Sequence, residues 1–294
     1  MKTLSDVQSL NSLAWELRLD DLNMVFGAKS GHLGGSFSAA ELITTLYFHK
    51  ARLDPKNPGW EDRDRIFVSK GHCAPIYYAA LSRLGFFPGD ELATFRQLGS
   101  RLQGHPDRLK LPGVEMSSGP LGLGASVAVG CALGLRLRSS PARVYCVLGD
   151  GETQEGIVWE SAMCAAKYAL GNLTFLLDYN RYQLSGAVDH VMPLEPLEHK
   201  WQSFGFDVRR IDGHDIEQIV EALDRNHPDQ PGLLRALTVK GKGVSFMESS
   251  SAWLGRVPSQ EEMSAAEKEI RGKIEAISSV CDVPQIASAS GRKS

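Results

Sequence analysis

Two side chains with oxygen ligands each follow an apolar stretch of the kind that forms a buried strand. Asp150 lies in the triplet Gly149-Asp150-Gly151, and Asn180 follows the next apolar stretch. A carboxylate, an amide oxygen and nearby carbonyls suit a small hard cation such as Mg²⁺, which usually keeps phosphate oxygens in its shell. Gly151 lets the backbone approach a phosphate, whose charge the following helix N-terminus favours. The pair therefore indicates a site for a metal ion and a phosphate group.

Three histidines have the setting expected for proton transfer. His32, His72 and His105 each follow a glycine in an irregular segment, and imidazoles exchange protons near neutral pH. We interpret the remaining histidines as structural residues of helices, loops or the surface, since a lone histidine is more often structural than catalytic; they are His49, His190, His199, His214 and His227.

The elements around Asp150 and Asn180 predict a βαβ unit. The apolar runs 144–148 and 173–177 are typical of parallel strands covered on both faces, and a helix is expected over 156–169 between them. Ligands of open α/β sheets bind at the carboxyl ends of the strands, where Asp150 and Asn180 lie. A Gly-Asp-Gly triplet alone is more often an ordinary turn, so this context carries the interpretation.

The rest of the chain continues the alternation of strands and helices. Helices are expected over 10–25, from Ser38 through Leu46, up to Leu84, and over 88–98, 122–137, 215–223 and 259–278; strands are expected over 65–68, 207–211 and 233–239. The segment 99–121 is predicted to be a long functional loop. We therefore expect a doubly wound α/β fold with a mostly parallel sheet and helices on both faces. One domain should span 1–283, followed by a disordered tail over 284–294.

Composition excludes several classes of function. With 32 basic and 35 acidic residues among 294, the chain has no basic field for nucleic acid or an anionic membrane. Its start carries acidic residues where a signal peptide needs an apolar stretch, and no segment approaches a membrane span, so we expect a cytoplasmic protein. Five scattered cysteines without a C-x-x-C pair argue against a disulfide framework or a zinc site.

Taken together, these motifs resemble those of the transketolase family. The Gly-Asp-Gly triplet, followed by a helix and a second strand ending at Asn, is similar to the thiamine diphosphate signature. Five segments have the family's order: 30–35 (SGHLGG), 69–72 (SKGH), 104–106 (GHP), 118–122 (SGPLG) and 149–156 (GDGETQEG). The resemblance covers nearly all of this chain but only the N-terminal part of a full-length transketolase.

The resemblance implies roles for individual residues. Asp150, Asn180 and the Tyr182 carbonyl would hold Mg²⁺, Ca²⁺ or Mn²⁺. Thiamine diphosphate would contact His72, Gly119, Leu121, Gly151, Glu152 and Asn180, and His32, His72 and His105 would surround its reactive carbon and the sugar hydroxyls. Glu155 and Glu160 are candidates for a subunit interface, although compensation of the helix dipole explains them equally well. Lys240 and Lys242 either approach the diphosphate or are solvated.

The implied activity is transfer of a two-carbon ketol unit from a ketose or ketose phosphate to an aldose. In transketolases, the carboxylate that contacts the cofactor's pyrimidine comes from a second domain, so we expect a separate C-terminal subunit that supplies this glutamate in an α2β2 assembly. Trp253-Leu254-Gly255 departs from the family, which typically has a histidine before this glycine. The donor and acceptor sugars therefore stay open.

Two alternatives remain at the level of sequence. The chain could be the N-terminal part of a deoxyxylulose phosphate synthase or of a 2-oxo acid dehydrogenase, but the Gly-His-Pro and Ser-Gly-Pro-Leu-Gly segments look more like transketolase. A binding or regulatory module that keeps the cofactor fold without turnover is the alternative from another class.

Overall fold

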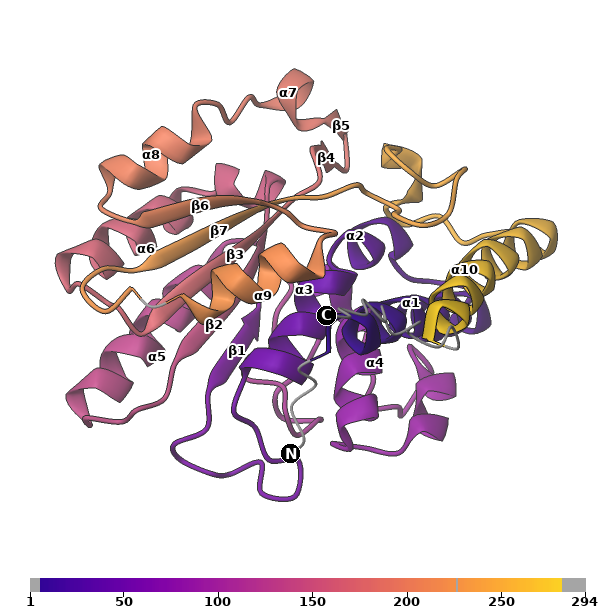
Figure 1. The fold of residues 1–294 in the computed structure, drawn as a ribbon, viewed down its shortest axis with the longest axis horizontal. Coiled ribbons are helices and arrows are strands. Elements are labelled where there is room, and N and C mark those ends of the chain that lie inside the picture. Colours follow the sequence, from indigo (N-terminus) through magenta and orange to yellow (C-terminus); the bar gives the residue numbers. More distant parts are fainter. Residues whose placement is uncertain (1–5, 226, 282–294) are drawn as a thin grey trace, which may run out of the picture.

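The computed structural model describes residues 6–225 and 227–281, and its centre is a five-stranded parallel sheet (Figure 1). The strands follow the order β1-β2-β3-β7-β6: β1 (Arg65–Val68), β2 (Val144–Gly149), β3 (Leu173–Tyr179), β7 (Gly232–Leu237) and β6 (Asp207–Asp212). Every neighbouring pair is parallel. The predicted parallel α/β sheet is confirmed. The tail predicted over 284–294 lies outside the described residues.

Helices cover both faces of the sheet because successive side chains of a strand point to opposite faces, and in the buried strands those on both faces are apolar. On β2, Tyr145 and Val147 belong to one apolar core, whereas Val144, Cys146 and Leu148 belong to the other. The first core contains α1 (Val7–Ala28), α3 (Ala40–Thr45), α4 (Ala74–Leu84) and α9 (Ile216–Asp224), with α10 (Gln260–Cys281) packed on α1. The second contains α5 (Leu123–Leu137), α6 (Gly156–Lys167) and α8 (Leu197–Ser203).

The prediction that a helix begins at Ser38 was wrong. Helix α2 (Leu33–Ser38) already includes Gly34 and Gly35, a break at Ala39 follows, and α3 continues into a π-helical turn, η1 (Leu46–Lys50). Ser38 caps no helix, because its hydroxyl donates to the Asp178 carboxylate on β3 at 2.6 Å. A contact between distant segments therefore replaces the local capping role.

Other differences from the predicted elements are smaller. The helix expected over 88–98 is a 3₁₀-helix, η3 (Gly89–Thr94), which ends where Phe95 turns inward and becomes buried. A short 3₁₀-turn, η2 (Gly71–Cys73), precedes α4. Several elements after Asn180 were not predicted, among them the antiparallel pair β4 (Tyr182–Gln183) and β5 (Gly186–Ala187), α7 (Val188–Val191) and α8.

Two observations bear on the environment of the protein. Across residues 6–225 and 227–281, no helix has the length and apolar character needed to cross a membrane. Cys73, Cys131, Cys146 and Cys164 are free thiols.

Candidate functional site

A cavity of about 370 Å³ at the carboxyl ends of β2 and β3 collects nearly all the predicted site residues. Its lining includes His32, His72, His105, Gly119, Leu121, Asp150, Gly151, Glu152, Glu155, Asn180 and Tyr182. Lys240 and Leu254 also line it. Two candidates are not part of this wall: Glu160 is exposed on α6, and Lys242 lines grooves elsewhere. Segments from across the first 254 positions thus converge as the motifs predicted.

Asp150 is a buried carboxylate at the end of β2. It accepts the backbone N–H of Gly151 at 2.7 Å and that of Arg181, whose left-handed φ of 66° turns the amide toward it. Burial, and then the charge of Asp178, raise the pKa of Asp150 to about 7, although the two backbone donors lower it. The Asp150 carboxylate forms no ion pair among the described residues, and burial outweighs the charge of Lys70, so a bound metal ion would stabilise the anion.

Asn180 presents its amide in one defined orientation. Its nitrogen donates to the Ser38 hydroxyl at 3.1 Å and to the Asp178 carboxylate at 3.2 Å, so the amide oxygen must lie on the other side. That oxygen accepts the Tyr182 N–H at 3.1 Å. The atom able to coordinate a cation therefore faces the segment whose carbonyl was predicted as a further ligand.

The sequence prediction missed Asp178, the residue that fixes this orientation. Its fully buried carboxylate accepts hydrogen bonds from Lys70, Ser38, Thr238 and Asn180. Burial alone would raise the pKa of Asp178, but the Lys70 ammonium and these donors lower it. An aspartate inside an otherwise apolar strand was the available signal, since a buried charge requires a partner.

Glu152 connects the glycine turns that surround the cavity. Its carboxylate accepts the Ser69 hydroxyl, the Gly122 N–H at 2.8 Å and the Gly149 N–H at 3.0 Å. Burial raises its pKa, whereas these three donors lower it. Close packing also requires Gly124, where an added Cβ would lie 2.3 Å from the Ser69 hydroxyl oxygen. Glu152 thus joins the β1, β2 and α5 ends of the site.

The three predicted histidines form a cluster on one side of the cavity. The ring centroids of His32 and His72 are 6.0 Å apart, and those of His32 and His105 are 6.4 Å apart. Burial lowers the pKa of all three; Lys70 adds to the effect at His72, and Arg96 adds to it at His105. They are therefore neutral near pH 7 and can act as hydrogen-bond donors and acceptors.

His32 is held by the segment that carries Leu254. Its Nδ1 lies 2.6 Å from the Leu254 carbonyl oxygen, which can only accept, so Nδ1 carries the proton and Nε2 keeps its lone pair. The main chain at Leu254 thereby selects the tautomer of a cavity histidine. Leu254 is itself one of the residues that line the same wall.

Arg96 connects two of the histidine-bearing loops and was also missed. It donates to the Ser30 hydroxyl at 2.7 Å and lies against Gly104, where an added Cβ would be 2.9 Å from the Arg96 Nε. Its backbone has a left-handed φ of 58°, a conformation that non-glycine residues rarely adopt. Nothing in the spacing of the sequence indicates this contact.

Replacing Arg96 by Met is expected to raise the pKa of His105, because the nearby positive charge that disfavours the imidazolium is removed. NMR titration of the histidine ring protons measures this directly. Arg101→Met is the matched control, since Arg101 pairs with Glu91 instead. An unchanged His105 titration in Arg96→Met would contradict this electrostatic account.

Lys240 brings a cation into the cavity wall. It is 1% exposed and forms no ion pair within the described part of the chain. Burial, and then the charge of Lys70, lower its pKa to about 8. Its side chain passes against Gly34, where an added Cβ would lie 3.1 Å from the lysine Cε. The cavity therefore holds a cation and a carboxylate, each lacking a full counter-charge.

Comparisons with known proteins agree with this arrangement. The chain matches the family described as the thiamine diphosphate-binding domain of transketolase over residues 10–273. It is 40% identical to the 6-deoxy-6-sulfo-D-fructose transketolase subunit SqwG of a Clostridium species, covering 90% of this chain and 96% of that protein. It is 38% identical to an apulose-4-phosphate transketolase subunit of Phocaeicola vulgatus, covering 86% of this chain and 91% of that protein.

A solved structure matches the fold as well. The transketolase from Campylobacter jejuni superposes with a TM-score of 0.85 at 31% identity, over 92% of this chain and 46% of that one. The cavity, the motifs that line it and these similarities lead to one conclusion. The chain belongs to the transketolase family and corresponds to its N-terminal, thiamine diphosphate-binding domain.

Proposed function

We propose that this chain is the thiamine diphosphate-binding subunit of a two-chain transketolase, and that a divalent cation holds the diphosphate in the described cavity. The observation that carries this proposal is the convergence of Asp150, Asn180, Lys240 and three histidines on one cavity. Relatives named as transketolase subunits, which this chain covers over 96% and 91% of their length, support it further. Titration with thiamine diphosphate, with and without Mg²⁺, tests it.

The donor set fits a metal ion that arrives together with phosphate. No group of three His, Cys, Asp or Glu side chains suited to a metal occurs among residues 6–225 and 227–281. The predicted ligands are instead one carboxylate, one amide oxygen and one carbonyl, from Asp150, Asn180 and Tyr182. With a single charged ligand, such a set needs further oxygen donors, which a diphosphate supplies. We propose Mg²⁺, with Ca²⁺ or Mn²⁺ as substitutes.

Other residues of the cavity bind and orient the cofactor. Gly151 and the Lys240 ammonium would face the diphosphate, with Glu152 holding the turns in place. Gly119, with a left-handed φ of 150°, and Leu121 would contact the aminopyrimidine. When bound, thiamine diphosphate supplies the electron sink for breaking and forming the carbon–carbon bond.

The histidines would move protons on substrate hydroxyls. A neutral imidazole with a free Nε2, as in His32, can accept a proton from a hydroxyl and return it. His72 and His105 extend the same polar wall. The reaction we propose is transfer of a two-carbon ketol unit between a ketose, or its phosphate, and an aldose.

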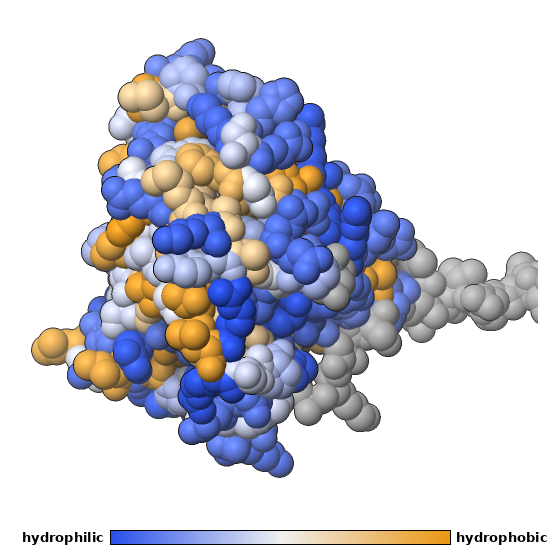
Figure 2. All heavy atoms as spheres, turned by 90° about the vertical axis from the view of Figure 1, so that its left-hand side faces the viewer, coloured by the Kyte–Doolittle hydropathy of each residue, from blue (hydrophilic) through white to orange (hydrophobic). Residues whose placement is uncertain are grey.

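The assembly we propose is α2β2, in the cytoplasm. Exposed apolar side chains lie near the cavity and on the adjoining helices: Leu121, Leu123, Val127, Met163, Leu184 and Met192. Figure 2 shows apolar groups gathered on the side of the molecule where α5 and α6 lie. Surfaces of this kind usually contact another chain. Glu155, the N-cap residue of α6, and Glu160 within α6 are both exposed and would then lie at the interface.

The substrate is open, and Leu254 is the residue most suited to influence it. Relatives are named for 6-deoxy-6-sulfo-D-fructose and apulose 4-phosphate, so sugars other than common ketose phosphates are candidates here. An apolar wall cannot select for a substrate hydroxyl by hydrogen bonding, whereas a histidine can.

Leu254→His is expected to change the order of preference among ketose donors, with relative kcat/KM between two donors shifting about two- to tenfold, the equivalent of one net hydrogen bond. Kinetics with the partner subunit on xylulose 5-phosphate and a panel of ketoses would measure this. Leu137→His, at an exposed position of α5, is the control. If all donors change by one common factor, Leu254 does not determine specificity.

A further inference from the structure

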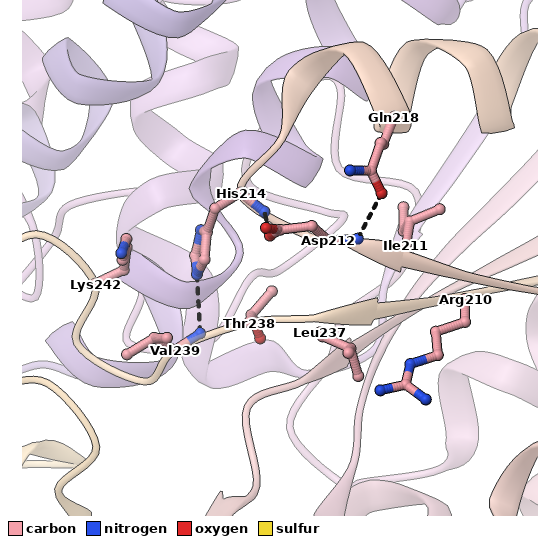
Figure 3. Close-up of a pocket in the computed structure, with 9 residues that line it drawn as sticks. All are labelled: Arg210, Ile211, Asp212, His214, Gln218, Leu237, Thr238, Val239 and Lys242. Carbon is pink, nitrogen blue, oxygen red and sulfur yellow. Dashed lines mark hydrogen bonds between the residues drawn. The ribbon is translucent and has the colours of Figure 1, made fainter.

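A second concavity, of about 570 Å³, lies beside the carboxyl ends of β6 and β7 (Figure 3). None of the residues predicted to form the site lines it, apart from Lys242, a candidate for diphosphate contact. His214, in the turn between β6 and α9, projects toward the main chain that leaves β7. From the sequence alone this histidine is interpreted as structural, and its contacts point to a more specific role in positioning the main chain.

Both ring nitrogens of His214 are engaged in hydrogen bonds. The Val239 N–H donates to its Nε2 at 2.8 Å, as the dashed line in Figure 3 shows. Because Nε2 accepts, Nδ1 must carry the proton, and it donates to the Glu41 carboxylate at 2.9 Å. His214 therefore connects helix α3 to the segment after β7 in one fixed tautomer.

Glu41 is itself held in place within the core. Arg18 of α1 donates to both of its carboxylate oxygens at 2.7 Å and to the Phe37 carbonyl at 2.8 Å. Burial opposes ionisation, but Arg18, followed by His214, lowers the pKa of Glu41 to about 2. A bidentate, charge-assisted pair of this kind is rigid, so it gives His214 a fixed support.

The supported segment needs such an anchor because the sheet ladder has already ended. β7 ends at Leu237, so no neighbouring strand pairs with the Val239 N–H. On the other side of Lys240, the Gly241 N–H donates to the Gly34 carbonyl at 2.9 Å. The main chain is thus fixed immediately before and after Lys240, whose side chain lies in the cofactor cavity.

We infer that His214, held by Glu41 and Arg18, is a positioning residue that fixes Val239 and thereby directs Lys240 toward the cofactor diphosphate. The inference rests on the proposed function, since it assigns the Lys240 ammonium to the diphosphate. It adds a network of three side chains behind the cavity, none of which lines the cavity itself. His214 acts through Lys240, so its effect should depend on that lysine.

A double-mutant cycle tests this dependence. Isothermal titration with thiamine diphosphate and Mg²⁺ would compare wild type with His214→Ala, Lys240→Met and the double variant. We expect Lys240→Met to weaken binding about 10- to 100-fold, as loss of a charged contact does, and His214→Ala to weaken it about tenfold. The double variant should bind no more weakly than Lys240→Met alone. Independent effects that multiply would overturn the inference.

Two further variants separate positioning from general stability. His214→Gln keeps an acceptor for Val239 and a donor for Glu41, so it should recover most of the affinity lost in His214→Ala. His199→Ala, at an exposed position of α8, should bind as wild type does. Failure of His214→Gln to bind better than His214→Ala, with both variants folded by circular dichroism, would count against the role.

A readout without cofactor keeps this inference distinct from the proposed function. Labelling of Lys240 by an amine reagent, followed by peptide mass spectrometry, should be severalfold faster in His214→Ala than in wild type, whereas His214→Gln should stay close to wild type. Labelling of Lys70 should stay slow. Equal Lys240 labelling in all three proteins would overturn the positioning role. A wild-type chain that binds no thiamine diphosphate would instead overturn the proposed function.

Discussion

Asp150→Ala is expected to abolish metal-dependent binding of thiamine diphosphate. Asp150 provides the one charged side chain of the proposed ligand set, and burial outweighs the charge of Lys70 in its effect on the Asp150 pKa. Loss of a charged contact costs about 1.5–3 kcal/mol, and a metal ligand contributes at least as much, so affinity should fall at least about 10- to 100-fold. The metal dependence should disappear with it, because Asn180 and a carbonyl cannot neutralise a divalent ion.

Calorimetric titration with and without Mg²⁺ would measure both effects. Asp150→Asn distinguishes charge from size, since it keeps the shape of the side chain and should be nearly as damaging. Asp90→Ala, at an exposed position of η3, is the control and should bind as wild type does. Undiminished affinity in a folded Asp150→Ala protein would remove the metal site from the proposal.

The purified chain alone is expected to show little or no ketol transfer, with activity appearing when a C-terminal subunit is added. The resemblance to transketolases implies a carboxylate against the aminopyrimidine, which would come from the protein because the protein orients the cofactor and sets its electrostatics. Two cavity carboxylates are engaged elsewhere, since Glu152 accepts three hydrogen bonds and Asp150 is the proposed metal ligand. The exposed Glu155 is the remaining carboxylate of the lining.

The experiment combines the two purified subunits and follows product formation. Activity should rise from background by several orders of magnitude and saturate at equal amounts of the two chains, and light scattering should give the mass of α2β2. A Glu155→Gln variant serves as a check, because it should keep substantial activity if the partner supplies the pyrimidine carboxylate. Robust turnover by the single chain, free of partner by mass spectrometry, would refute the two-subunit requirement. A complex without turnover on any ketose would favour the non-catalytic binding module.

The sequence was sufficient to predict the strands of a mostly parallel sheet and the family, but not the order of the strands. Continuous apolar runs predicted β2 and β3 because strands covered on both faces tolerate no alternation with polar residues. Local capping rules failed at Ser38, whose hydroxyl bonds to Asp178 on a distant strand. The short hairpin after Asn180 is two residues per strand and carries no periodic signal.

The sequence motifs predicted most of the residues that line the cavity. Glycine-flanked histidines and strand-terminal oxygen donors converge on the cavity, and the prediction of a thiamine diphosphate-dependent transketolase subunit is confirmed by the relatives. The supports behind the site could not be predicted. Arg96, Asp178 and His214 act through contacts with segments far away in the sequence, which neither spacing nor periodicity reveals. The roles of the individual residues stay predictions until binding is measured.

The buried pair of Lys70 and Asp178 constrains how this enzyme can evolve. Neither side chain is more than 1% exposed, and each is the other's counter-charge, with Lys70 in the wall of the cavity. Losing one partner leaves the other as an unpaired buried charge. This costs about 3–5 kcal/mol, a large part of a typical domain's stability. A library that varies one position at a time will therefore recover wild type at both sites. Other residue pairs should be recovered when both codons are randomised together. The two positions should therefore change together in evolution and not one at a time.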